Sequence, residues 1–151
     1  MTFADALAVL AKREVEFMVV GGLAVARAGY ARITDDLDLL VEASESNLST
    51  LIDVLCTFGE GAAAELTPAD FPLEEGCVRI VEDFPIDIFT LMSARTYADL
   101  EPLSVPHEVE GEVVRFLSAE GLIQLKADSL RPKDQLDVQV LRDILSRKGS
   151  S

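Results

Sequence analysis

The sequence has few cysteines and no long hydrophobic run, and each absence narrows the class of protein. Its 151 residues include only two cysteines, Cys56 and Cys77, without the spacing of a metal site, so we expect buried, reduced thiols and no disulfide framework. No segment reaches the roughly 20 consecutive apolar residues of a membrane-spanning helix. The N-terminal residues lack the basic stretch and apolar run of a signal peptide. Together these absences predict a cytoplasmic protein that does not bind a membrane.

Basic residues are also scarce: 13 Lys and Arg stand against 27 Asp and Glu, which gives a formal net charge of -14. This argues against a protein that binds a polyanion along its whole surface, because such proteins use Lys and Arg to displace counterions. From residue 126 onward, however, six basic residues accompany four acidic ones. An acidic body with a mildly basic C-terminal end suits a metal site beside a local phosphate contact, although basic residues at a helix end are also favoured by the helix dipole.

Apolar periodicity and turn residues divide the chain into helices and strands within one domain, residues 1–151. The pattern predicts an α+β (mixed α/β) fold with a mixed sheet of four to five strands, flanked by helices, two of them C-terminal. The Gly- and Pro-containing stretch 59–76 is predicted to be a long exposed loop. Helices are predicted at about 3–13, 23–28, 47–58, 119–130 and 132–145, and strands at 16–20, 36–41, 77–83, 85–91 and in a hairpin at 105–117.

Two aspartates alternate with leucines on the strand predicted at 36–41. Asp36 and Asp38 therefore project from one face, and Leu37 and Leu39 from the other. Two neighbouring carboxylates repel each other unless a cation lies between them. Their hard oxygen atoms favour Mg²⁺ or Mn²⁺. Acidic pairs are common at solvated strand ends, however, so this pair alone is weak evidence for a metal site.

Two further features strengthen the interpretation as a metal site. Asp87 lies within the otherwise apolar strand at 85–89, where a lone charge is costly unless it is paired or ligated, although an Asp87 that faces water would give the same pattern. Gly21 and Gly22 follow a strand and open a helix, so their backbone N–H groups can approach a phosphate without obstruction by a side chain. The combination predicts a site that handles phosphates.

The segment VVGGLAVARAGYARITDDLDLLV resembles the signature of the minimal nucleotidyltransferases, which have a DNA-polymerase-beta-like fold. A second block, KADSLRPKDQLD at 126–137, makes the chain similar to the AbiEii-type toxins and to short bacterial nucleotidyltransferase-like proteins. Many members carry Gly-Ser at the position of Gly21-Gly22, and toxin relatives often carry a further helical domain. The residues that carry the resemblance are Gly21, Gly22, Arg32, Thr34, Asp36, Asp38, Lys126, Arg131, Pro132, Lys133, Asp134 and Asp137.

The resemblance implies transfer of a nucleoside monophosphate from a nucleoside triphosphate (NTP) to an acceptor hydroxyl on a tRNA or a protein, with release of pyrophosphate. It also implies a role in a toxin–antitoxin pair with a cognate partner. Asp36, Asp38 and Asp87 would bind Mg²⁺ or Mn²⁺, and Asp87 would assist deprotonation of the hydroxyl. Lys126 would neutralise charge on the pyrophosphate.

The remaining residues of the two blocks are assigned to nucleotide binding: Gly21, Gly22, Arg32, Thr34, Lys133, Asp134 and Asp137. Thr34 more plausibly fixes the turn before the strand. For Lys133, Asp134 and Asp137 a structural role fits equally well, because Asp134 suits a helix start and Asp137 can pair with Arg131 or Lys133. The alternative function is a non-catalytic nucleotide-binding or antitoxin-like module on the same fold.

Overall fold

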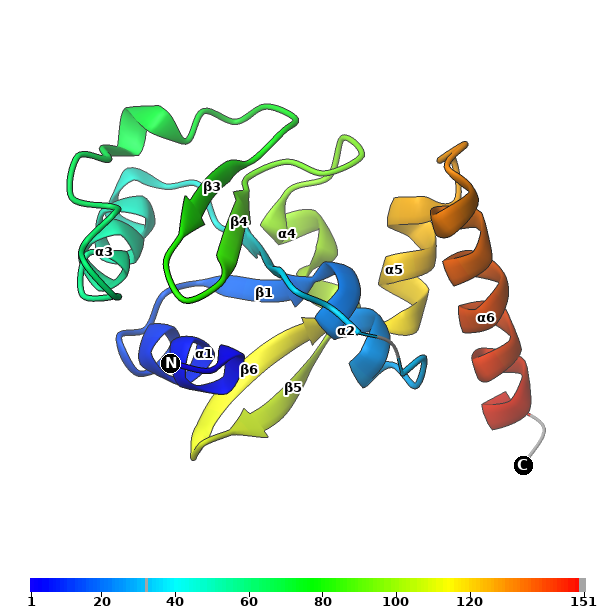
Figure 1. Cartoon of the computed structure of the whole chain (residues 1–151). Helices are drawn as coiled ribbons and strands as arrows, with labels where there is room; N and C mark the ends of the chain where they lie inside the picture. Colours follow the sequence, from blue (N-terminus) through cyan, green and yellow to red (C-terminus); the bar gives the residue numbers. More distant parts are fainter. Residues whose placement is uncertain (32, 150–151) are drawn as a thin grey trace.

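The computed structural model describes residues 1–31 and 33–149 and shows a mixed α/β fold built on one sheet (Figure 1). Within the described residues the sheet has six strands in the order β3-β4-β2-β1-β6-β5. The expected four to five strands are too few, because the segments at 77–91 and 105–117 each form a complete two-stranded hairpin. The strands are β1 (Phe17–Val20), β2 (Leu37–Val41), β3 (Val78–Val81), β4 (Pro85–Phe89), β5 (Ser104–Val109) and β6 (Glu112–Leu117).

Most of the helices begin at local sequence signals, although α2 begins after Val20 without a side-chain cap. Thr2 and Asp5 form a capping box at the start of the first helix, and Pro132 opens the last one, as the sequence predicts. The short α4 was not predicted, since four residues are too few to show helical periodicity. The helices are α1 (Phe3–Lys12), α2 (Gly21–Arg27), α3 (Glu45–Leu55), α4 (Tyr97–Leu100), α5 (Ala119–Lys126) and α6 (Pro132–Gly149), with short 3-10 turns at Pro68–Asp70 and Glu101–Leu103.

The core is centred on β1, whose four residues are all buried. This strand lies inside the sheet between β2 and β6, which explains why its sequence is apolar without alternation. Helix α2 packs on β1 and β2, and α5 contacts both α2 and β6. Helices α5 and α6 lie side by side at one end of the sheet, beyond α2 (Figure 1). This arrangement brings the C-terminal block near the glycine-rich start of α2.

One expectation about exposure is wrong, and another is confirmed only in part. Both cysteines are free, as predicted, but Cys77 is exposed and Cys56 is only half-buried. Cys77 directly precedes the edge strand β3, where one side of the backbone has no neighbouring strand. The loop at 59–76 is not fully exposed either, because Phe71 joins the core and the Thr90 hydroxyl donates to the Pro72 carbonyl, 2.7 Å away. None of the described helices combines the length and the apolar character needed to cross a membrane.

Candidate active site

The acidic part of the site lies on two adjacent strands. Strands β2 and β4 pair in parallel, and their register places Asp38 directly opposite Asp87. Asp36 immediately precedes β2, two residues before Asp38, so the three side chains emerge on the same face of the sheet. The structure therefore places the third carboxylate on the neighbouring strand, as the metal-site hypothesis requires.

A residue that the sequence analysis missed, Arg79 on β3, binds two of these carboxylates. Its Nε lies 2.8 Å from Oδ1 of Asp87, and its Nη2 lies 2.9 Å from Oδ2 of the same residue. The same Nη2 lies 3.0 Å from Oδ2 of Asp36. Arg79 is the only basic residue between positions 33 and 94, and this isolation is the sequence signal by which it could have been selected as a site residue. Its place opposite Asp87 in the β3–β4 register could not be predicted without the strand pairing.

Among the three carboxylates, Asp38 is the one whose charged form is clearly destabilised by its surroundings. Burial raises its pKa to about 6, and the charge and hydrogen bond of Asp87, with the charge of Asp36, act in the same direction. One guanidinium thus faces three carboxylates, which leaves the cluster with a surplus of negative charge. Among residues 1–31 and 33–149, no three His, Cys, Asp or Glu side chains lie in metal-ligating geometry as they stand. Asp36 and Asp87 are instead directed at Arg79.

Gly21 provides the space in which the Asp38 carboxylate lies. Its φ is +71°, a backbone conformation that side chains rarely adopt. A Cβ at this position would collide with Oδ2 of Asp38. The glycine is therefore required both by the backbone conformation and by the approach of the carboxylate.

We expect Gly21→Ala to destabilise the protein by more than the matched variant Gly76→Ala. Both glycines have positive φ, but a Cβ at Gly76 meets nothing within 4 Å. Gly76→Ala should therefore lose only the backbone term of about 1 kcal/mol, whereas Gly21→Ala should lose about 2 kcal/mol or more because Asp38 must also move. Chemical denaturation of both variants measures the difference, and equal losses would contradict the tight approach of Asp38.

The basic part of the site is held by two buried aspartates at the α5–α6 junction. The Nζ of Lys126, at the end of α5, lies 2.8 Å from Asp137 and 3.3 Å from Asp134. Asp134 also accepts hydrogen bonds from Ser129 at 2.7 Å and from Arg131 at 2.8 Å. Burial alone would raise the pKa of Asp134, but these donors and the Lys126 charge lower it to about 2.

These contacts show which charges Lys126 neutralises. Asp137 pairs with Lys126, because α6 packs against α5 and turns this side chain inward. The charge of Asp137 also raises the pKa of Arg131, although the contact with Asp134 contributes more to that shift. The charge of Lys126 is already shared by two carboxylates. Lys133 forms no ion pair within the described part of the chain, which makes it the lysine with the more available charge.

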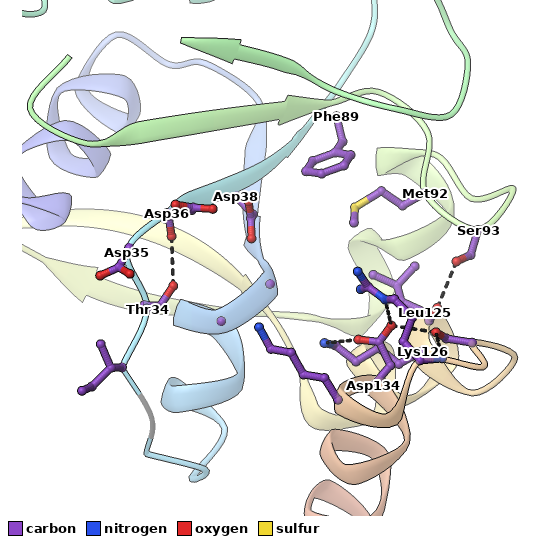
Figure 2. Close-up of a pocket in the computed structure, with 16 residues that line it drawn as sticks. Thr34, Asp35, Asp36, Asp38, Phe89, Met92, Ser93, Leu125, Lys126 and Asp134 are labelled. Atoms are coloured by element: carbon purple, nitrogen blue, oxygen red, sulfur yellow. Dashed lines mark hydrogen bonds and ion pairs between the residues drawn. The ribbon is translucent and has the colours of Figure 1, made fainter. Parts of the chain in front are cut away.

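The acidic and basic parts line one cavity of about 640 Å³ (Figure 2). The predicted site residues along it are Gly21, Gly22, Thr34, Asp36, Asp38, Lys126, Lys133 and Asp134. Thr34 fixes the turn, since its hydroxyl donates to the Asp36 carbonyl at 3.1 Å. Asp87, buried beneath Arg79, and Asp137 are not among the lining residues, and Arg32 lies outside the described residues.

Three apolar side chains that the sequence analysis did not select form a further wall of this cavity. Phe89 follows Asp87 by two residues on β4 and therefore faces the same way. Met92 lies beside it, and Leu125 lines the same cavity from the end of α5 (Figure 2). The period-two alternation of β4 is the sequence signal that could have placed Phe89 on the same face as Asp87. Met92 and Leu125 come from separate elements, so no sequence pattern connects them.

A tight turn that follows β4 holds this apolar wall in place. Ser93 and Ala94 at its centre have φ of 48° and 61°, values that non-glycine residues rarely adopt. The Ser93 hydroxyl donates to the Leu125 carbonyl, and the Ala94 N–H donates to Glu75, both at 2.9 Å. The turn is thus anchored to the end of α5 and to the loop before β3.

Comparison with known proteins supports the fold. No family model matches the sequence, and no curated protein matches it. Among solved structures, the chain is similar to a Thermotoga maritima protein described as a "putative nucleotidyltransferase", with a TM-score of 0.53 and 17% sequence identity. The match covers 97% of this chain and 96% of that one. This likeness over nearly the whole chain shows that the protein has a nucleotidyltransferase-like fold.

Proposed function

We propose that the protein is a metal-dependent nucleotidyltransferase that transfers a nucleoside monophosphate from an NTP to an acceptor hydroxyl. The observation that carries the proposal is that acidic residues line one side of a single cavity and basic residues line the other. Asp36 and Asp38 line it from β2, and Lys126, Arg131 and Lys133 line it from the α5–α6 junction. A nucleotide triphosphate needs carboxylates that hold its cation and basic groups that bind its phosphates. The nucleotidyltransferase-like fold agrees with this assignment.

The chemistry of the carboxylates fits a divalent cation. The Arg79 guanidinium already stands between Asp36 and Asp87, so a positive group is stable in this place. Arg79 leaves part of the negative charge of the three carboxylates uncompensated, and Asp36 and Asp38 both line the cavity. When bound, Mg²⁺ or Mn²⁺ would stabilise the charge on the phosphoryl oxygens. The residues proposed to hold it are Asp36, Asp38 and Asp87.

The other residues of the cavity have roles that follow from their contacts. The backbones of Gly21 and Gly22 would hold the phosphates without obstruction by side chains. Lys133 would bind the departing pyrophosphate more effectively than Lys126, whose charge is shared by Asp134 and Asp137. Asp38 would accept the proton of the attacking hydroxyl, because Asp38 lines the cavity whereas Asp87 does not.

The apolar wall supports a nucleotide as the substrate in preference to inorganic polyphosphate. Phe89 and Asp87 are separated by two strand residues, or roughly 7 Å, which places an aromatic ring about one nucleoside away from the carboxylates. Aromatic rings bind bases of every type by stacking. We therefore assign Phe89, Met92 and Leu125 to the base of the NTP.

Phe89→Ala should weaken NTP binding about tenfold or more, because base stacking on an aromatic ring contributes about 1–3 kcal/mol. Binding of inorganic tripolyphosphate should be unchanged, since it carries no base. Calorimetry with both ligands in the presence of Mg²⁺ tests this, and Phe58→Leu in the core, away from the cavity, serves as the control for general packing effects. An equal loss for both ligands would show that Phe89 only supports the fold.

The finer assignment to the AbiEii-type branch rests on the sequence blocks at 21–38 and 126–137. On this basis we extend the proposal to a tRNA or protein acceptor and to a role in a toxin–antitoxin pair. Within the described residues, α5 and α6 follow the last strand of the sheet.

A second candidate function is a nucleotide-binding or antitoxin-like module without turnover. The observation in its favour is the contact of Arg79 with Asp36 and Asp87, which directs two of the three carboxylates away from a ligand-ready arrangement. Such a module would bind an NTP but would not transfer label.

The proposed function is tested by incubation of the protein with each of the four α-labelled NTPs, Mg²⁺ or Mn²⁺, and cellular RNA or lysate protein. We expect label on the protein itself, on RNA or on another protein, and its loss in EDTA. A blank result with all four nucleotides, together with NTP binding by calorimetry, would favour the second function.

A further inference from the structure

Arg79 occupies the position between the carboxylates that a bound cation would need. Its guanidinium bonds both oxygens of Asp87, and Nη2 bridges Asp87 and Asp36 with distances of 2.9 and 3.0 Å. We propose that Arg79 is an internal counter-cation that competes with the divalent cation for these two carboxylates. The proposal rests on the metal site of the proposed function and concerns its regulation.

The competition follows from charge and from the geometry of the pair. A divalent cation at Asp36 and Asp87 would lie next to a guanidinium that uses the same oxygens, and two positive groups at such a distance repel each other. The bidentate pair with Asp87 is of the strong, directional kind, so it does not yield to a weakly bound ion. Cation binding therefore requires the guanidinium to leave Asp36 and to release an oxygen of Asp87.

The location of Arg79 permits this exchange without a change of fold. Strand β3 is an edge strand, and the Arg79 side chain is 52% exposed, whereas that of Asp87 is 8% exposed. The long arginine side chain can therefore rotate toward solvent while Asp87 stays in place. In the described part of the chain, its guanidinium forms ion pairs with Asp87 and Asp36 only.

The proposal predicts that Arg79→Gln lowers the stability of the metal-free protein but raises its affinity for the divalent cation. Without metal, Arg79→Gln leaves the buried Asp87 without its charged partner, so the protein should unfold at a lower temperature. With metal, the same substitution removes the competitor, so the cation should bind more tightly. A residue with a merely structural role would lower both stability and cation affinity.

The test is calorimetric titration of the full chain with Mn²⁺ alone, together with thermal unfolding in EDTA and in Mn²⁺. We expect Arg79→Gln to unfold at a lower temperature in EDTA but to bind Mn²⁺ at least tenfold more tightly than the wild type. Its stabilisation by Mn²⁺ should also be larger. Arg13→Gln, an exposed residue outside the site, controls for the change in net charge.

The outcomes separate this proposal from the proposed function. If the wild type binds Mn²⁺ and Asp87→Asn does not, the metal site is supported; equal or weaker binding by Arg79→Gln would then overturn the competition alone. If neither the wild type nor Arg79→Gln binds Mn²⁺, both proposals fail. Should Arg79→Gln not fold, Arg79→Lys replaces it: a lysine keeps the charge but loses the bidentate contact, so we expect severalfold tighter binding, and unchanged affinity contradicts the proposal.

Discussion

Asp38→Asn is expected to reduce label transfer by about 1000-fold or more, because Asn cannot supply the negative charge that a cation and a hydroxyl proton require. The substitution should leave the fold intact. Asp38 is destabilised by burial and by the adjacent Asp87 and Asp36, as its raised pKa of about 6 shows. An uncharged side chain of the same shape relieves that repulsion, so we expect an unfolding temperature in EDTA that equals or exceeds that of the wild type.

The opposite directions of these two effects make the prediction specific. Initial rates of label transfer and thermal unfolding should be measured on the same preparation. Asp53→Asn, which removes one charge from an exposed position on α3, should keep the full rate. A lower unfolding temperature for Asp38→Asn would indicate that Asp38 stabilises the fold, and a retained rate would exclude it from the reaction.

Asp137→Ala is expected to reduce the free energy of unfolding by about 3–5 kcal/mol, the usual effect of removing one partner of a buried ion pair. The Asp137 side chain is 1% exposed and lies 2.8 Å from the Lys126 Nζ, which would keep only its longer contact with Asp134. In a domain of about this size the loss corresponds to a fall in unfolding temperature of roughly 10 °C. Chemical and thermal denaturation measure both quantities.

Two further variants distinguish the ion pair from a general effect on α6. Asp143→Ala removes a charge from an exposed position on the same helix and should change stability little. The double variant Lys126→Met/Asp137→Leu removes both charges and should recover part of the lost stability, because two apolar side chains avoid the unpaired buried charge. A similar loss in all three variants would contradict a specific Lys126–Asp137 pair.

Arg79 and Asp137 illustrate why the two halves of the site differ from the expectation. The sequence blocks contribute acidic and basic residues that line one cavity of about 640 Å³. They do not say which charges neutralise each other. In the structure, Lys126 pairs with Asp134 and Asp137, and Arg79 pairs with Asp36 and Asp87. Among the lysines that line the cavity, Lys133 therefore has the more available positive charge.

Features that depend on a few neighbouring residues could be read from the sequence alone. The Thr2 capping box, the helix start at Pro132 and the alternation of Asp36 and Asp38 with leucines are each contained within about one turn or one strand, and all three are present in the structure. The nucleotidyltransferase-like fold was likewise predicted, because the glycine pair and the aspartates carry a recognisable spacing.

Features that join distant segments were decided by the tertiary structure. The parallel register of β2 and β4 places Asp87 opposite Asp38, and the β3–β4 hairpin turns Arg79 onto Asp87. Helix α5 brings Leu125 into the cavity that Phe89 also lines. The segments that meet lie far apart in the chain or depend on a strand register, and a shift of one residue would turn every side chain to the opposite face. Local patterns determine the elements, whereas the burial of the whole core selects the register in which their charges meet.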